Sequence, residues 1–250
     1  MQNRALRERE QYNTGLKRSR YVEILKHCKA FSGAEEIIRR EMCSASSQKA
    51  LCFGAKTWRL WLEWNQIYPD SVHAINVSER ELKQGEDISK QTEIKPVFHL
   101  MDAHKLDFND NEFDLVFGSA MLHHLDLHVA LREIQRVLKP NGKIVFYEPL
   151  GINPVSKVVR LFTPEARTDD EQPFRMKELA ILNEYFNVNL HSFQLLSVPV
   201  GVVSGLIFNN PENFLTYGAS TVDRALLRII PSSKYLYRDV LIVGQHKQPS

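Results

Sequence analysis

Two adjacent histidines, His123 and His124, stand in a loop directly after the apolar run FDLVFGS at 113–119. An imidazole whose pKa is near neutral can take a proton from a hydroxyl or carboxyl group of a substrate. A loop histidine that only hydrogen-bonds the backbone has the same sequence signature. No second group at a recognisable spacing completes a catalytic pair. We take His124 as the candidate catalytic base and His123 as a candidate substrate contact.

The surrounding stretch contains the elements that would position these histidines. The run FDLVFGS suits a buried strand by its length and its Val and Phe content. Apolar residues then recur at helical spacing up to 138, Lys-Pro-Asn-Gly at 139–142 is typical of a helix end, and IVFYEP follows. This order predicts the βαβ unit of a parallel sheet, and ligands of such sheets bind beyond the carboxyl ends of the strands. Those ends carry Gly118, Ser119, the two histidines and Glu148.

The pairing of FDLVFGSAMLHHL with LKPNGKIVFYEP, one helix apart, resembles the class I S-adenosylmethionine-dependent methyltransferases. The resemblance can be followed over residues 48–245 and implies an α/β fold. The sheet would be seven-stranded and mostly parallel, Rossmann-like, with helices on both faces and an antiparallel last strand. Residues 47–250 would form this methyltransferase-like domain, and residues 1–46 an N-terminal helical cap of the same domain. The cap would either cover the site as a lid, with Tyr12 and Tyr21 facing it, or pack against the sheet.

The loop after the first predicted strand, KALCFG, departs from the family pattern. The family has an acidic residue, one apolar residue and then three glycines at alternate positions. Aligned on this pattern, the chain has Cys52 for the acid and Gly54, Lys56 and Trp58 for the glycines. Either the loop has shifted and still binds the cofactor, with Lys56 pairing its carboxylate, or the site is blocked. Spacing also allows Trp58, with the tryptophans at 61 and 64, to be part of the core.

The resemblance implies S-adenosylmethionine as the cofactor and assigns its contacts by position. The backbone of Gly54, Ala55 and Lys56 would approach the cofactor closely. At the end of the second strand the family has an acid for the ribose hydroxyls, where this chain has an amide. After the third strand, an acid and a small residue would contact the adenine, although a solvated turn aspartate is an equal alternative. These further cofactor-binding candidates are Asn76, Val77, Asp102, Ala103 and Ser119.

The segment from 147 to 175 resembles a subgroup of small-molecule methyltransferases in which EPLG, NP, TP and RT-x-[DE]-E-x-P recur. It lies where an acceptor would enter. Glu148, Arg160 and Arg167 are therefore the further substrate-binding candidates, because arginines can hold an anionic acceptor. An ion-paired structural loop is the alternative for each residue. The apolar, Gly-containing segment 197–217 is expected to pack on the core, or else to cover a hydrophobic acceptor.

Composition excludes several classes of protein. The 250 residues are 43% hydrophobic and 25% charged, as in a globular domain, and the net charge of +2 gives no reason to expect nucleic acid as a partner. The start, MQNRALRERE, is charged, and no apolar run reaches membrane-spanning length, so we expect a cytoplasmic protein without a membrane span. Three cysteines, Cys28, Cys43 and Cys52, are expected to be reduced. No metal-ligand cluster is found in the sequence.

Two functions from different classes remain. The first is a methyltransferase that moves a methyl group from S-adenosylmethionine to a small-molecule acceptor. The second is a catalytically inactive protein with the same fold, which would serve as a binding or partner subunit. Cys52, Lys56, Trp58 and Asn76 are the residues that would discriminate them. An NAD-dependent dehydrogenase fits less well, because no hydride-handling residues stand out. The acceptor and the oligomeric state are not predicted.

Overall fold

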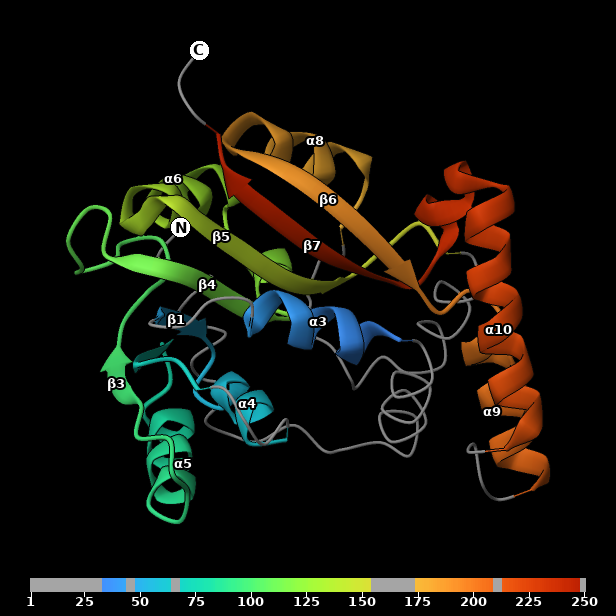
Figure 1. Cartoon of the computed structure of the whole chain (residues 1–250), viewed down its shortest axis with the longest axis horizontal. Helices are drawn as coiled ribbons and strands as arrows, with labels where there is room; N and C mark the ends of the chain where they lie inside the picture. The colour runs from blue at the N-terminus through green and yellow to red at the C-terminus, as the bar shows by residue number, and fades with distance from the viewer. Residues whose placement is uncertain (1–32, 44–47, 64–67, 154–173, 209–212, 248–250) are drawn as a thin grey trace.

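The computed structural model describes residues 33–43, 48–63, 68–153, 174–208 and 213–247. Within this part, seven strands form one sheet in the order β3-β2-β1-β4-β5-β7-β6 (Figure 1). The first five strands pair in parallel, and β7 is antiparallel to both β5 and β6. The predicted fold class is confirmed. The strands are β1 (Lys49–Phe53), β2 (Ser71–Asn76), β3 (Val97–Leu100), β4 (Phe113–Ser119), β5 (Leu138–Pro149), β6 (Phe186–Phe193) and β7 (Asp239–His246).

Helices cover both faces of the sheet, as predicted. Helices α6 (Leu127–Val137) and α8 (Met176–Tyr185) pack on one face, where Leu131, Ile134 and Leu182 join side chains of the central strands in one apolar cluster. A second cluster on the other face includes Ile38 and Trp61. Because the central strands are covered on both faces, they are apolar along almost their whole length. The helical elements of the second face are α3 (Ala34–Met42), η1 (Thr57–Arg59), α4 (Leu60–Glu63) and α5 (Glu79–Ser89).

Helix α3 is the described part of the expected N-terminal cap. Ala34, Ile38 and Met42 are buried in the second apolar cluster, and the helix lies against β5 and β7. It therefore packs on the sheet and is not a lid, because its apolar side chains are taken up by the core. Tyr12 and Tyr21 lie outside the described residues, and so does the rest of residues 1–32.

The predicted helix end before 139–142 is confirmed, although these residues form the first part of β5 and no separate turn lies between helix and strand. Helix α6 ends at Val137 and β5 begins at the next residue, so Pro140 and Gly142 belong to a strand. Phe113 pairs with Leu138 but Leu115 pairs with Lys143, so between these pairs one residue of β4 opposes four of β5. The surplus residues form an irregularity inside β5, and the turn residues are accommodated there.

A helical hairpin connects β6 to β7. It consists of α9 (Ser197–Ile207) and α10 (Phe214–Ile229), which run side by side at one end of the sheet, and is followed by η4 (Pro231–Leu236) (Figure 1). The expectation that segment 197–217 packs on the core is wrong for the outer side of α9. There the large apolar side chains, among them Val203 and Ile207, are exposed. Among the described residues, no helix is both long and apolar enough to cross a bilayer.

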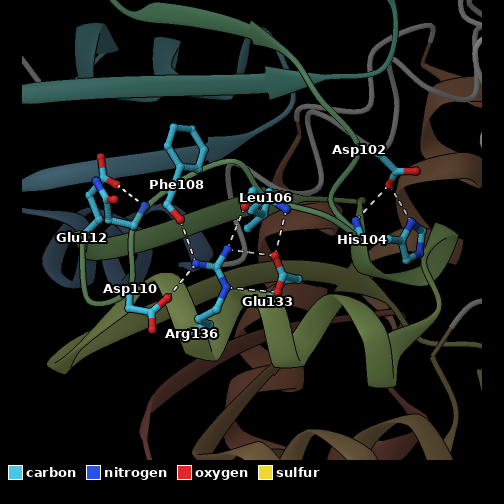
Figure 2. A network of polar contacts seen from close by, with 9 residues as sticks. Asp102, His104, Leu106, Phe108, Asp110, Glu112, Glu133 and Arg136 are labelled. Atoms are coloured by element: carbon cyan, nitrogen blue, oxygen red, sulfur yellow. Dashed lines mark hydrogen bonds and ion pairs between the residues drawn. The ribbon is translucent and has the colours of Figure 1, made fainter.

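The connection between β3 and β4 contains no helix and is held by Arg136 of α6 (Figure 2). The Arg136 guanidinium donates to the carbonyl oxygens of Leu106 and Phe108, both at 2.7 Å, and to Asp110 at 2.8 Å. It also donates twice to Glu133, at 2.9 and 3.1 Å, and Glu133 accepts from the Leu106 N–H at 2.9 Å. These hydrogen bonds satisfy loop groups that a helix would otherwise have paired.

We expect Arg136→Gln to lower the free energy of unfolding by about 2 kcal/mol, because several charge-assisted hydrogen bonds are lost at once. The measurement is urea unfolding at neutral pH. Hydrogen exchange should also show faster exchange of the Leu106 amide, because Glu133 is no longer held in place. The matched control is Arg132→Gln on the exposed side of the same helix, which should change the free energy by less than about 0.5 kcal/mol.

The same variant should change the response to acid. Hydrogen bonds from Arg136 are the largest cause that lowers the pKa of Glu133. A lowered pKa means that this stabilisation is present at neutral pH and is lost as the pH falls and Glu133 is protonated. Arg136→Gln should remove this part of the acid dependence. Equal losses of stability in the Arg136 and Arg132 variants would contradict the assignment.

Candidate cofactor and acceptor site

The loops after β1, β2, β3 and β4 leave the sheet at the same edge. Phe53, the last residue of β1, pairs with Ile75 of β2 and with Gly118 of β4, and Asn76 of β2 pairs with Leu100 of β3. The strand order reverses between β1 and β4, since β2 and β3 follow on one side and β5 on the other. Open parallel sheets bind ligands at such a reversal. The structure therefore gathers the cofactor candidates at one edge.

The turn after β1 requires glycine at its first position. Gly54 has φ of 105°, which strains any residue with a side chain. A Cβ there would also lie 3.3 Å from Cγ2 of Thr57. The Gly54 N–H donates to the Ile75 carbonyl at 3.0 Å, and the Thr57 hydroxyl donates to the Gly54 carbonyl at 2.9 Å. The predicted strand-to-helix turn is confirmed, and its backbone is fixed from both sides.

The two side chains that replace family glycines are both engaged by protein groups. The indole of Trp58 is fully buried, its Nε1 donates to the Ala55 carbonyl at 2.9 Å, and its ring meets Phe98 edge-on at 6.4 Å. The ammonium of Lys56 contacts Glu81 at 2.8 Å and Gln84 at 2.7 Å on α5. The core interpretation of Trp58 is confirmed, and Trp61 is also buried in this core. Any cofactor contact of Lys56 is therefore left to its backbone.

Cys52 holds the position of the family's first acid. Burial raises the pKa of its thiol to about 12, and the side-chain hydrogen bond with Thr57 opposes this shift only in part. The thiol is therefore neutral at physiological pH. The negative charge that the family pattern has at this position is absent from this chain.

Gly85 on α5 contributes to the same turn, although our sequence analysis did not single it out. A Cβ at this position would overlap the Ala55 carbonyl oxygen and the Phe98 ring. Helix α5 thus packs directly on the backbone of the β1 turn. A glycine inside the helix ERELKQGEDIS was the available signal, since it costs about 1 kcal/mol relative to alanine without a packing reason.

Asn76 ends β2 with its side-chain oxygen already in use. Its Oδ1 accepts from the Ser78 N–H at 2.8 Å, and Ser78 in turn caps α5 by accepting from the Glu81 N–H at 3.3 Å. Because the oxygen faces the Ser78 N–H, the Nδ2 group is the part of the amide that can act as a donor. The polarity at this position is thus opposite to that of the family carboxylate. Val77, the next residue, is half-buried.

Asp102 is half-exposed and carries a lowered pKa, mainly because the His104 side chain hydrogen-bonds to it. Its Oδ1 accepts from the His104 N–H at 2.9 Å and lies 2.6 Å from His104 Nδ1 (Figure 2). His104 Nε2 accepts from the Asp126 N–H at 2.9 Å, so the proton of a neutral ring resides on Nδ1. Asp102 is therefore held in place and ionised, beside the buried Ala103. Sequence reasoning missed His104.

Glu148 positions the loop that carries the two histidines. Its side chain has no exposed surface, its Oε1 accepts from the N–H groups of Met121 and Leu122, both at 2.9 Å, and its Oε2 lies 2.7 Å from His123 Nδ1. With both oxygens engaged inside the protein, Glu148 does not face an acceptor. The expectation of a substrate contact is therefore corrected to a positioning role. The loop starts after Ser119, at Ala120 with φ of 55°.

The rings of the two histidines are in tilted contact and are mostly buried. Their ring centroids are 4.0 Å apart with 39° between the planes, and each has less than a tenth of its surface exposed. His123 is oriented by Glu148, and His124 packs on His123. Arg160 and Arg167, the other acceptor candidates, lie outside the described residues. The described residues contain no group of three or more side chains suited to hold a metal ion.

The comparison with protein families identifies a methyltransferase domain over residues 51–146, which runs from β1 into β5. Demethylmenaquinone methyltransferase of Staphylococcus saprophyticus is 35% identical over 114 residues, which are 44% of this chain and 48% of that protein. The enzyme of the same name from Staphylococcus aureus is 34% identical over 114 residues, 44% of this chain and 47% of that protein. The match thus spans about half the length of these curated relatives.

Solved structures show the same fold at low identity. Phosphoethanolamine N-methyltransferase 2 of Haemonchus contortus, in complex with S-adenosyl-L-methionine, superimposes with a TM-score of 0.60 at 17% identity, covering 85% of this chain and 52% of that one. Geranyl diphosphate C-methyltransferase of Streptomyces coelicolor gives a TM-score of 0.60 at 11% identity, over 86% and 80%. Residues 51–146 therefore match a methyltransferase domain, and the described chain shares its fold with these S-adenosylmethionine-dependent enzymes.

Proposed function

We propose that this chain transfers a methyl group from S-adenosylmethionine to a small-molecule acceptor. The observation that carries the proposal is the family match over residues 51–146, because this stretch contains all four loops at the candidate site. The fold supports it, since those loops leave adjacent strand ends. The curated relatives that match are themselves named as methyltransferases.

The residues at the sheet edge suit the cofactor. Lys56 and Trp58, the two bulky departures, are engaged by α5 and by the core. The backbone of Gly54 and Ala55 would face the amino-acid end of the cofactor. Asn76 and Val77 would face the ribose, Asp102 and Ala103 the adenine, and Ser119 would lie beside them. Asp102 fits because an ionised carboxylate accepts hydrogen bonds from an exocyclic amine.

The bound cofactor would supply a methyl group already activated on a sulfonium, so the protein must mainly position the nucleophile. In a neutral His123, the contact with Glu148 places the ring proton on Nδ1. His124 would take the proton from an acceptor hydroxyl or carboxyl group. Arg160 and Arg167 remain the proposed contacts of an anionic acceptor.

The similar proteins are named for different small-molecule acceptors. The curated relatives are named for demethylmenaquinone, whereas the solved neighbours are named for phosphoethanolamine and geranyl diphosphate. We take demethylmenaquinone, supplied in its reduced hydroquinone form, as the first acceptor to assay, because only this form has the hydroxyl from which His124 would take a proton. A cytoplasmic location remains part of the proposal.

The second candidate, an inactive binding protein, is favoured by two residues. Cys52 is neutral where the family has an acid, and the Asn76 oxygen is occupied by the Ser78 N–H. Both changes remove negative charge from the region where the cofactor would bind. The two functions differ in whether the protein binds S-adenosylmethionine and in whether it turns the cofactor over.

Isothermal titration with S-adenosylmethionine and S-adenosylhomocysteine should show binding of both. Asp102→Asn should weaken the affinity by about tenfold or more, because a charge-assisted hydrogen bond is replaced by a neutral one. The matched control is Asp107→Asn, an exposed aspartate of the same loop, which should bind like the wild type. Absence of heat and of thermal stabilisation with both ligands would end the enzyme proposal.

Asn76→Asp should increase the affinity for S-adenosylmethionine by up to about tenfold. The carboxylate keeps the hydrogen bond from Ser78 and adds a charge-assisted acceptor for the ribose hydroxyls. The same titration measures the effect, and Asn109→Asp on the exposed part of the β3–β4 connection is the control. Unchanged or lower affinity would show that the ribose does not contact this position.

His124→Gln should lower methyl transfer to demethylmenaquinone by about 10²–10⁴-fold if His124 is the base. The affinity for S-adenosylmethionine should stay within about twofold of the wild type, because this residue is assigned to the acceptor. Transfer of label from S-adenosylmethionine measures the rate. His128→Gln, at an exposed histidine of α6, is the control. Wild-type turnover in the His124 variant would remove this residue from the mechanism.

A further inference from the structure

Helix α9 exposes large apolar side chains and buries several small or polar ones. A helix of a water-soluble domain buries its large apolar side chains and exposes polar ones. In α9 the outward side chains are apolar, with Val203 54% and Ile207 69% exposed, and the preceding Leu196 continues the same stripe at 41%. Apart from Val198, which is 3% exposed, the described buried positions of α9 are small or polar. They are Ser197, Gly201, Ser204 and Gly205, all buried.

Small and polar residues also form the contact between α9 and α10. Ser204 Oγ lies 3.2 Å from Thr216 Oγ1, and Ser197 Oγ donates to Asp223 at 2.9 Å. Gly201 and Gly205 are four residues apart, the spacing that lets two helices approach closely in lipid. Small residues and side-chain hydrogen bonds therefore form part of this contact. Such packing is typical of helices whose outer surface meets hydrocarbon.

Helix α10 adds its own outward stripe to this surface. Phe214 is 76% exposed, Tyr217 58%, and Ile229, at the other end of the helix, 77%. We call the exposed apolar side chains of both helices the apolar hairpin face; it comprises Leu196, Val203, Ile207, Phe208, Phe214, Leu215, Tyr217, Val222 and Ile229. An exposed apolar surface of this extent marks an interaction site.

Charge identifies the kind of partner. Among the described residues from 196 to 236, the charged side chains with exposed surface are Arg224, Arg228 and Lys234. Asp223, the acidic residue among these described residues, is buried and accepts from the N–H groups of 195, 196 and 197, whereas Glu212 lies outside the described part of the chain. A basic rim beside an apolar face complements an anionic lipid surface.

A cavity of about 570 Å³ lies at the base of the hairpin, between α10, β6 and α3, and the three basic side chains line it. Ser220 also lines it; its Oγ is buried and has no hydrogen-bond partner among the described residues. Glu36 and the engaged Asp223 are the acidic groups of the lining. A buried hydroxyl without a partner, next to three cations, suits a phosphate headgroup.

We propose that the α9–α10 hairpin docks the protein on an anionic phospholipid bilayer. The apolar hairpin face enters the interfacial region of one leaflet, and the basic rim with the cavity receives a headgroup. Helix α9, with 11 residues, is about 16 Å long and too short for the hydrocarbon core of about 30 Å, so the hairpin lies in the interface. It leaves the sheet beside Pro149, at the edge that carries the candidate site.

Vesicle flotation at 0.1 M salt tests the proposal. The full chain should float with vesicles of phosphatidylcholine and phosphatidylglycerol at three to one, and only weakly with phosphatidylcholine alone. Val203→Glu with Ile207→Glu should reduce the bound fraction by about tenfold or more, because two apolar side chains that enter the interface become charged. The control is Val97→Glu. Val97 is 50% exposed and lies on β3, the outermost strand on the side of the sheet away from β6 and the hairpin.

A double arginine variant tests the basic rim separately from the apolar hairpin face. Arg224→Gln with Arg228→Gln should weaken binding to the anionic vesicles by about fivefold per arginine and leave binding to phosphatidylcholine unchanged. Absence of flotation with both vesicle types, or equal flotation of the Val203/Ile207 variant and the wild type, would overturn the proposal. So would a dimer in sedimentation that this double variant dissociates without any vesicle binding, since a second copy would then cover the face.

Discussion

The candidate site depends on one buried carboxylate, that of Glu148 at the end of β5. Burying a carboxylate costs several kcal/mol unless donors surround it. Here two backbone N–H groups and the His123 ring surround it, all from the loop after β4. This contact fixes the loop in one conformation and sets the orientation of His123, on which His124 packs. Removing the carboxylate would therefore release the loop that carries both histidines.

The turn after β1 forms in this chain although two of the three glycines of the family pattern are replaced. Of the three positions where the family has glycine, Gly54 alone has a positive φ, which disfavours residues with a side chain. At the next two glycine positions the chain has long side chains, and the surrounding helix and core provide partners for both: Lys56 binds α5, and Trp58 binds its own turn. Gly85 supplies the close approach from the α5 side. In this chain, the glycines that allow close backbone contact at the turn lie on two elements, Gly54 in the loop and Gly85 in α5.

The helical hairpin between β6 and β7 differs from the rest of the described chain in which side chains it buries. In the domain, apolar side chains of the helices face the sheet, as expected in water. In the hairpin, polar and small groups face each other and apolar groups face outward. One chain thus contains one part stabilised by apolar burial and another that is stabilised by hydrogen bonds and close helix contacts. The second arrangement is consistent with an environment other than water on its outer side.

The sequence by itself indicated the βαβ unit from β4 to β5 and the turn at Gly54, because periodicity and glycine requirements are local properties of the chain. The seven-stranded, mostly parallel sheet was expected from the family resemblance, and helix α9 was not predicted. The sequence also indicated Asp102 and the histidine pair, since they follow strand ends. Only the tertiary structure decided that Glu148 is buried, that Lys56 and Trp58 are engaged by protein groups, and that His104, Gly85 and Arg136 support the site. These outcomes depend on contacts between residues far apart in the chain, about 25 residues for His123 with Glu148 and 28 for Lys56 with Gln84. The direction in which a side chain points across such a distance is set by packing, which no local pattern records.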